Sequence, residues 1–270
     1  MLWHMVFLID ADELRRGDSG ALVIDARKAD AYARGHIPGA VHLTTYDIFV
    51  PGTRPAELAA FRADLAGRYA AAGVAADRPV VVYDDETGMR AARELWILEY
   101  LGHRHARMLH GGLKAWTAAG GALATEATPP VPARFEAGEL PEAAISADEV
   151  LAMGRAGTIR ILDVRDATEF AGKDHTACCA RRGRIPGAAW LEWTELLDPE
   201  SGRFRSREEI RAALAARGVD PGATLVPYCH RGARSANTYY ALRHAGCASV
   251  RNYIGSFHDW SARSELPLEA

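Results

Sequence analysis

Short apolar runs alternate along the chain with longer segments in which apolar residues recur at helical spacing. The runs predict strands at 23–27 (VIDAR), 80–84 (VVVYD), 159–165 (IRILDVR) and 223–228 (ATLVPY). The longer segments predict helices at 58–74, 92–102, 208–219 and 235–246. Strands that are apolar on consecutive positions and separated by helices are typical of a parallel sheet covered on both faces, so the pattern predicts the α/β class.

The second half of the chain repeats the order of motifs found in the first half. Residues 23–43 (VIDARKADAYARGHIPGAVHL) and 161–191 share an apolar pair, Asp-x-Arg, an aromatic residue and Gly-x-Ile-Pro-Gly-Ala. The second copy carries an insertion, KDHTACCARR, before the Gly-x-Ile-Pro-Gly element. Further on, Trp116 corresponds to Trp260. A repeat of this length predicts two copies of one domain.

A proline-rich stretch separates the two copies. Residues 123–143 hold three prolines in four positions and show no periodicity, which is typical of an extended linker. We therefore expect an N-terminal domain at 1–122 and a C-terminal domain at 144–270. The N-terminus, MLWHMVFLIDADEL, lacks a basic lead-in and a cleavage site, and it predicts a first strand rather than a signal peptide.

The composition is that of a globular protein with hydrophobic cores. The chain is 49% hydrophobic and 25% charged, with a net charge of -3 and no strongly basic half, which argues against nucleic-acid binding. No apolar run approaches a membrane span. The four cysteines form no CxxC zinc pattern, so we expect no metal, reduced thiols and a cytoplasmic location.

The stretch PYCHRGARSAN contains the candidate chemistry. Cys229 follows a predicted strand, at the edge of a parallel sheet where ligands bind, and a helix is expected to begin near Ser235. The turn from His230 to Arg234 is long enough to direct its N–H groups toward the sulfur. Such a ring of donors, with Arg231 and Arg234, favours a thiolate, so Cys229 is predicted to be a nucleophile.

The length of this turn bears on the kind of anion that it binds. A tyrosine-phosphatase-like loop needs five residues between its cysteine and arginine, whereas four separate Cys229 from Arg234. The shorter loop suits a sulfur atom carried on the cysteine better than a phosphate. A phosphatase or arsenate reductase is therefore the less favoured interpretation.

Taken together, the Asp-x-Arg, Gly-His-Ile-Pro-Gly-Ala, Cys-x-x-Gly-x-Arg-Ser and Gly-Ser-Phe-x-x-Trp elements resemble the rhodanese family of two-domain sulfurtransferases. The resemblance covers nearly the whole chain. It implies two tandem rhodanese-like domains, each a five-stranded parallel sheet with helices on both faces. It also implies that the C-terminal cysteine carries a sulfane sulfur from a donor to an acceptor, with no organic cofactor.

The resemblance implies Cys229 as the catalytic residue. The substrate-binding residues that it implies are His230, Arg231, Gly232, Ala233, Arg234, Ser235 and Arg165. A cation at Arg231 favours the dianion thiosulfate as donor. Arg165 fits a donor pocket and a buried ion pair with Asp163 equally well.

The first copy is expected to be inactive because Asp84 stands where the second copy has Cys229. Gly88 and Arg90 match Gly232 and Arg234, so we expect the loop to be built around a carboxylate that cannot carry sulfur. One active site per chain follows.

We therefore expect a thiosulfate sulfurtransferase that passes sulfur to cyanide or a thiol through a Cys229 persulfide. Two alternatives stay open: a 3-mercaptopyruvate sulfurtransferase, and a sulfur-carrier or interaction module that does not turn over. We expect a monomer with no nucleic-acid or membrane partner. Cys178 and Cys179 are interpreted as exposed thiols of the insertion and Cys247 as core, while Arg181, Arg182 and Arg184 either add positive field or lie in solvent.

Overall fold

The computed structural model describes residues 7–17, 20–138, 142–174 and 179–269, which form two compact units. Unit 1 comprises Met1–Asp47, Arg62–Leu140 and Pro199–Arg203, and unit 2 comprises Ile48–Phe61, Pro141–Asp198 and Phe204–Ala270. Each unit thus holds one sequence repeat plus a short segment from the other half of the chain. The two exchanged segments are not visible in the repeat pattern from which the domains were predicted.

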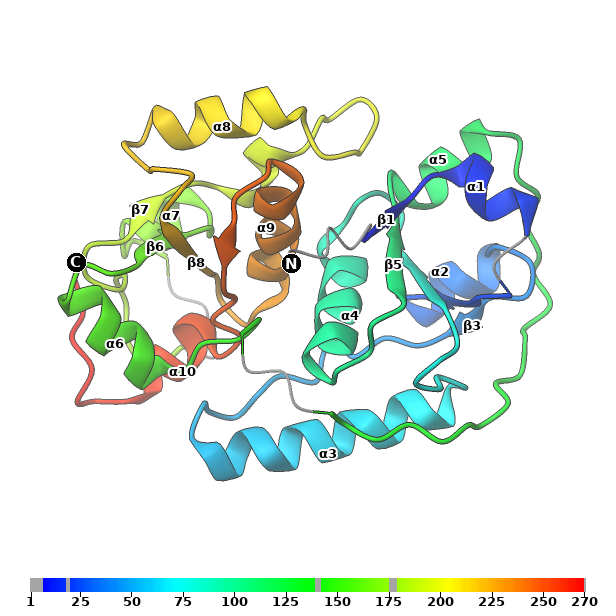
Figure 1. Ribbon diagram of the computed structural model, residues 1–270, viewed down its shortest axis with the longest axis horizontal. Coiled ribbons are helices and arrows are strands. Elements are labelled where there is room, and N and C mark those ends of the chain that lie inside the picture. The colour runs from blue at the N-terminus through cyan, green and yellow to red at the C-terminus, as the bar shows by residue number, and fades with distance from the viewer. Residues whose placement is uncertain (1–6, 18–19, 139–141, 175–178, 270) are drawn as a thin grey trace. The chain divides into compact units, whose positions relative to one another are not determined.

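Unit 1 is a five-stranded parallel sheet with the strand order β1-β5-β4-β2-β3 (Figure 1). Its strands are β1 (Leu8–Ile9), β2 (Leu22–Asp25), β3 (Val41–His42), β4 (Val80–Tyr83) and β5 (Ala106–Leu109). The helices of the first repeat are α1 (Ala11–Arg16), α2 (Ala29–Arg34), α3 (Pro55–Ala71), α4 (Met89–Tyr100) and α5 (Gly112–Ala118).

Both faces of this sheet are covered. Val81 and Tyr83 of β4 pack in one core cluster with Leu14 of α1 and Trp116 of α5. Neighbouring side chains of a strand point to opposite faces, so Val82 points the other way, and α4 packs on β4 and β5. The consecutive apolar positions of β4 follow from this two-sided burial.

Unit 2 has a parallel sheet with the strand order β7-β6-β8-β9. Its strands are β6 (Arg160–Asp163), β7 (Ala189–Trp190), β8 (Thr224–Tyr228) and β9 (Ser249–Val250). Its helices are α6 (Ala147–Arg155), α7 (Ala167–Phe170), the 3-10 helix η1 (Trp193–Leu196), α8 (Arg207–Ala215), α9 (Ala233–His244) and α10 (Ser256–Ala262). The predicted class, two α/β domains with parallel sheets, is confirmed.

The second sheet has four strands among the described residues, where the family resemblance implied five. Ala144 pairs with Asn252 through one isolated parallel bridge beyond β9. A single bridge is too short to form a strand, so the sheet ends with β9 at that edge.

The helices begin slightly earlier than predicted. Helix α9 begins at Ala233 rather than near Ser235, because Gly232 adopts φ 89°, a left-handed conformation that glycine tolerates and that turns the chain directly into the helix. Helix α3 begins at Pro55, whose fixed φ and missing N–H suit the first helical position.

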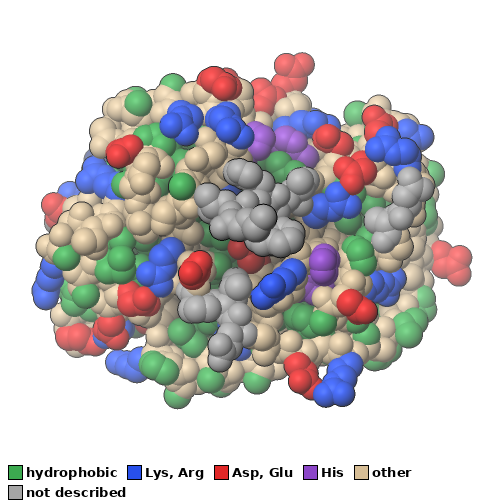
Figure 2. All heavy atoms as spheres, viewed as in Figure 1, with side chains coloured by type: hydrophobic (Ala, Val, Ile, Leu, Met, Phe, Trp, Pro, Cys, Tyr) green, Lys and Arg blue, Asp and Glu red, His purple; other side chains and the backbone are tan. Residues whose placement is uncertain are grey.

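Among the described residues, none of the helices combines the length and the apolar character needed to cross a membrane. Figure 2 shows Lys and Arg side chains interspersed with Asp and Glu side chains on the visible face. This mixture agrees with the small net charge of -3.

Candidate active site

Cys229 lies directly after strand β8, and its side chain is buried with 1% of its surface exposed. The backbone N–H of Gly232 donates a hydrogen bond to the Sγ atom at 3.1 Å. The loop therefore folds back over the thiol, as a short turn between a strand and a helix permits.

Helix α10 supports the loop from outside. The N–H of Phe257 donates to the carbonyl of Cys229 at 2.9 Å, and the N–H of His258 donates to the carbonyl of His230 at 3.0 Å. These two bonds satisfy the carbonyls of the first two loop residues. Backbone hydrogen bonds from α10 thus help to hold the loop in place.

Ser256 contacts the cysteine most directly. Its Oγ accepts a hydrogen bond from the N–H of Cys229 at 3.1 Å, donates to the carbonyl of Tyr253 at 2.8 Å and lies 3.9 Å from the Cys229 sulfur. Ser256 has φ 51°, the only positive φ at a non-glycine residue in the described part of the chain. Such backbone strain is typical of functional sites.

Ser256 was not predicted to be a site residue, although it belongs to the Gly-Ser-Phe element of the family resemblance. A signal was present in the comparison of the two repeats: the first copy has Gly112 where the second has Ser256. Glycine is the ordinary residue at a left-handed position. A serine in that place, only in the copy with the cysteine, points to a use for its hydroxyl.

Three residues lower the pKa of Cys229. Burial acts first and raises it, but the positive charge of Arg234, the N–H and hydroxyl of Ser235 and the N–H of Arg231 outweigh burial, so the pKa is lowered from its ordinary value. A lowered pKa increases the thiolate fraction at neutral pH. The site is therefore suited to a nucleophilic thiolate.

Arg234 is fixed by Glu169 of α7. Its Nη1 donates to Glu169 at 2.6 Å and its Nη2 donates to the same carboxylate at 3.1 Å, a bidentate ion pair. Burial raises the pKa of Glu169. Glu169 is a site residue that the sequence did not reveal, because it lies 65 positions from Arg234 in the chain.

His230 is half-buried among positive charges. Burial, followed by the charges of Arg231, Arg234, His258 and Arg165, lowers its pKa to about 4. Its imidazole is therefore neutral at physiological pH. The nearby arginines, which contribute to this shift after burial, also give the region around the loop positive charge that favours anions.

Arg231 extends toward the segment 48–61 of unit 2. Its guanidinium lies over the ring of Phe49, with Cζ 4.1 Å from the ring centroid. Its backbone N–H faces the Cys229 sulfur and helps to lower the pKa of the thiol.

Arg165 is held by a buried ion pair. It binds Asp163 at 2.6 Å and donates to the carbonyl of Gly183 at 2.9 Å. In unit 1, Arg27 binds Asp25 at 2.6 Å in the same way. Because this arrangement recurs where no cysteine is present, the geometry favours a role in the fold over a role in the donor pocket.

The remaining predicted residues divide between the loop and the scaffold. Ala233 is the first residue of α9, and Ser235 in its first turn is buried. Arg181 caps the end of α10 by donating to the carbonyls of Trp260, Ser261, Arg263 and Leu266. Arg181 therefore stabilises the fold at the end of α10, a role that the sequence did not predict.

Two other cysteines, Cys179 and Cys247, lie among the described residues. Cys179 is buried, which corrects the expectation of an exposed thiol, while Cys178 lies outside the described residues. Cys247 is buried, and burial raises its pKa. Cys229, Cys179 and Cys247 are all free thiols.

In unit 1, Asp84 occupies the position of Cys229. Its carboxylate accepts hydrogen bonds from the N–H of Asp85 at 2.8 Å and of Arg90 at 3.1 Å. Burial raises its pKa. In this loop a carboxylate thus takes the place of the sulfur and accepts hydrogen bonds from backbone N–H groups.

The unit 1 loop differs from the Cys229 loop in length. Three residues lie between Asp84 and Gly88, whereas two lie between Cys229 and Gly232. A Cβ at Gly112 would lie 2.4 Å from the carbonyl oxygen of Asp84, so a serine does not fit there. The two loops are therefore related in sequence but differ in shape.

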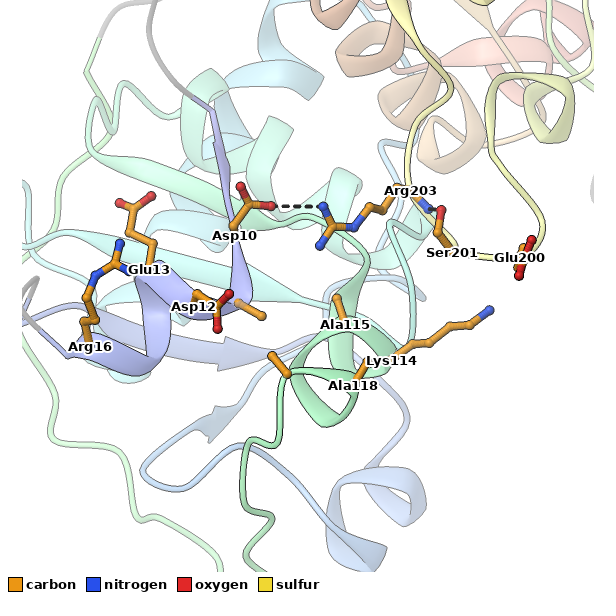
Figure 3. A pocket seen from close by; sticks show the side chains of 12 residues that line it. Asp10, Asp12, Glu13, Arg16, Lys114, Ala115, Ala118, Glu200, Ser201 and Arg203 are labelled. Atoms are coloured by element: carbon orange, nitrogen blue, oxygen red, sulfur yellow. Dashed lines mark hydrogen bonds and ion pairs between the residues drawn. The ribbon is translucent and has the colours of Figure 1, made fainter.

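Unit 1 also holds an open pocket of about 650 Å³ between α1, α5 and residues 200–203 (Figure 3). Carboxylates and cations both line it, and Arg203 is paired with Asp10 at 3.1 Å. None of the predicted site residues lines this pocket. No cysteine is among its described lining residues, and it is not the candidate active site.

Comparison with known proteins agrees with this geometry. The rhodanese-like domain model matches the chain twice, at residues 10–119 and 146–263. A thiosulfate sulfurtransferase of Pseudomonas aeruginosa is 32% identical over 94% of this chain and 93% of its own length. A 3-mercaptopyruvate sulfurtransferase of Escherichia coli is 31% identical over 91% of this chain and 87% of its own length.

Solved structures give the same fold. The anaerobic ergothioneine biosynthesis enzyme of Chlorobium limicola, in complex with trimethyl histidine, superimposes with a TM-score of 0.86 at 25% identity, over 98% of this chain and 70% of that one. A related complex, with ergothioneine covalently linked to a persulfide, gives a TM-score of 0.86 at 26% identity and the same coverage.

A buried thiol in a ring of backbone donors at the end of a parallel strand defines a class of α/β enzymes that use a cysteine nucleophile. The chain belongs to the rhodanese-like family, and the class of its activity is sulfur transfer.

Proposed function

We propose that the protein moves a sulfane sulfur from thiosulfate to cyanide or a thiol through a persulfide on Cys229. The observation that carries the proposal is the buried Cys229 sulfur, with the N–H of Gly232 at 3.1 Å and a lowered pKa. A thiolate held in this way is nucleophilic, and the same donors stabilise the negative sulfur that replaces it.

In the first step the Cys229 thiolate attacks the outer sulfur of thiosulfate. A new sulfur–sulfur bond forms at the cysteine, the bond to the sulfonate breaks, and sulfite leaves with the electron pair. The negative charge stays on the terminal sulfur of the persulfide. No proton is moved, which suits a site whose His230 is neutral.

In the second step cyanide or an acceptor thiolate attacks the terminal sulfur. The sulfur–sulfur bond to the cysteine breaks, thiocyanate or an acceptor persulfide leaves, and Cys229 returns as a thiolate. Each step displaces an anion from a sulfur atom, so the loop amides and Arg234 meet a negative charge throughout.

The preference for thiosulfate rests on the positive surroundings of the loop. Arg231, Arg234 and Arg165 all act on His230, and they favour a doubly charged donor over a singly charged one. The Escherichia coli relative favours the second candidate, 3-mercaptopyruvate, whose sulfur would be taken with pyruvate enolate as the leaving group.

The test is mass spectrometry of the intact protein after incubation with thiosulfate. We expect a gain of one sulfur atom that Cys229→Ser abolishes and that Cys247→Ser, a matched buried cysteine, leaves intact. Catalytic formation of thiocyanate should follow the same pattern.

Two results would contradict this proposal. Faster turnover with 3-mercaptopyruvate than with thiosulfate would favour the second candidate. Sulfur uptake without turnover would favour a carrier or interaction module.

The three described cysteines are free thiols, and a persulfide cycle needs its thiol reduced, so we also infer a cytoplasmic enzyme. We infer a monomer as well, since the chain already contains two copies of the domain. Fractionation of the host cell and light scattering of the purified protein test these two points. Recovery in an oxidising compartment, or a dimer, would contradict them.

A further inference from the structure

Phe49 contacts two residues that border the Cys229 loop, although it precedes the second repeat by about a hundred residues. Its segment, residues 48–61, is part of unit 2. The Phe49 ring lies under the guanidinium of Arg231, 4.1 Å from Cζ to the centroid. It also meets the imidazole of His258 edge to face, with centroids 5.1 Å apart at 80°.

The segment that carries Phe49 is anchored four residues further on. The buried hydroxyl of Thr53 donates to Asp259 of α10 at 2.6 Å and accepts from the N–H of Ala147 at 3.0 Å. Tyr253 donates to the same carboxylate of Asp259 at 2.8 Å. The ring is therefore held against unit 2 by buried hydrogen bonds and not by its own packing alone.

A stacked arginine is prepared to bind an anion. The guanidinium is planar, so a ring beneath it contacts its face and not the edge that carries the N–H groups, whereas an unsupported arginine loses much side-chain freedom when it binds. Stacking therefore fixes the direction of the donors before the ligand arrives.

The corresponding position of unit 1 has the opposite charge. Glu86 stands where unit 2 has Arg231, and Lys114, at the position of His258, pairs with it at 3.0 Å. The cation is thus present only in the copy that contains a cysteine. This difference links the stacked arginine to the chemistry of Cys229 rather than to the shared fold.

We propose that Phe49 is a positioning residue that holds the Arg231 guanidinium in one orientation and thereby gives preference to a doubly charged sulfur donor. This rests on the proposed function, in which Arg231 binds the sulfonate end of thiosulfate. A dianion gains more than a monoanion from a fixed cation, so the ring acts on donor selectivity rather than on the sulfur-transfer step.

The experiment compares steady-state kinetics with thiosulfate and with 3-mercaptopyruvate. For Phe49→Leu we expect the KM for thiosulfate to rise about three- to tenfold, the range of a cation–π contact, with a smaller change in kcat. Phe49→Tyr keeps the ring and should stay near wild type. The KM for 3-mercaptopyruvate, with its single carboxylate, should change less.

The double variant tests whether the ring acts through the arginine. If it does, Phe49→Leu adds nothing to the KM of Arg231→Ala, because the guanidinium is already absent. Arg231→Lys keeps the charge without the planar group, and its KM for thiosulfate should rise while the ring itself stays intact.

A matched control is Phe170→Leu. Phe170 is half-buried in unit 2 and lies under Arg184, 4.7 Å from Cζ to the centroid, and that arginine is not in the loop. We expect thermal stability to change similarly in Phe170→Leu and Phe49→Leu, but the KM for thiosulfate to change only in the latter.

Three results would overturn the inference. Phe49→Leu could raise the KM for thiosulfate equally with and without Arg231, or it could leave that KM unchanged while Arg231→Ala raises it. The third is an Arg231→Lys variant whose KM for thiosulfate matches that of the wild type. Failure of the proposed function has a separate signature. The wild type itself then takes no sulfur from thiosulfate, and the inferred selectivity falls with it.

Discussion

Ser256 and Gly112 occupy the same position in the two repeats and share one backbone conformation, with φ 51° at Ser256 and 57° at Gly112. Only Ser256 bears a side chain, and its hydroxyl accepts a hydrogen bond from the N–H of Cys229. The copy that contains Cys229 therefore accepts a strained serine where the copy that contains Asp84 has an unstrained glycine. The difference locates the hydroxyl as part of the sulfur site.

The first prediction separates strain from chemistry at this position. Ser256→Gly and Ser256→Ala both remove the hydroxyl, so both should slow persulfide formation on Cys229 about tenfold. The alanine variant keeps the left-handed strain, and its free energy of unfolding should be about 1 kcal/mol below that of the glycine variant. Rapid mixing with thiosulfate and urea unfolding measure the two effects. Full activity in Ser256→Gly would show that the hydroxyl is not needed.

The second prediction concerns the thiolate. Arg234 is the strongest of the groups that lower the pKa of Cys229, so Arg234→Gln should raise that pKa. Thiol reactivity falls as pH drops below the pKa. The midpoint of the pH profile of alkylation by iodoacetamide should therefore move to higher pH in Arg234→Gln, with a slower rate at pH 7.

Glu169→Gln is the matched variant for this test. It removes the carboxylate that faces Arg234 at 2.6 Å, which leaves the arginine charge less compensated. The midpoint for Cys229 should then move to lower pH, opposite to Arg234→Gln. Shifts of the same sign in both variants would mean that the loop has changed shape and that charge is not the cause. The test is done in a Cys247→Ser background, which removes another described thiol of unit 2. Burial raises the pKa of that thiol.

The position of Cys229 was predictable because it depends on local sequence: an apolar strand, a short turn and a helix. The repeat likewise predicted the class of the fold. Glu169 and Phe49 were missed because their roles depend on contacts with residues far away in the chain, which periodicity does not encode. Ser256 differs from this pair, because the replacement of Gly112 by a serine in the second repeat is visible in the sequence. The two possible roles of Arg165 were not separable by sequence either, since a buried ion pair and a pocket for an anionic donor both use an arginine at this position.

The third prediction concerns the copy that has Asp84 in place of the cysteine, which we expect to be inactive. Asp84→Cys in a Cys229→Ser background should not restore activity, and sulfur uptake from thiosulfate should stay roughly 100-fold or more below wild type. The loop there is one residue longer, Gly112 supplies no hydroxyl, and Glu86 places a negative charge where unit 2 has a cation. These features raise the pKa of a thiol instead of lowering it. Intact-mass spectrometry measures the uptake.

The control for the third prediction is the reverse exchange. Cys229→Asp should fold, because unit 1 shows that a carboxylate can accept the loop amides, but it should take up no sulfur. Turnover by Asp84→Cys/Cys229→Ser at a rate near wild type would contradict the view that the two loops differ in chemistry.

The fourth prediction tests the anchor of residues 48–61. Thr53→Val keeps the shape of the side chain but removes the hydrogen bond to Asp259 and the acceptor for the N–H of Ala147. Leaving these buried groups with fewer partners should lower the free energy of unfolding by about 2–4 kcal/mol, while Thr53→Ser keeps both bonds and should cost less than about 1 kcal/mol. Urea unfolding gives the energies, and hydrogen exchange reports whether α10 is affected. Asp259 lies beside His258 in the helix that holds the Cys229 loop, so Thr53→Val should also lower the rate of persulfide formation. An unchanged rate in a destabilised protein would show that the anchor and the site are independent.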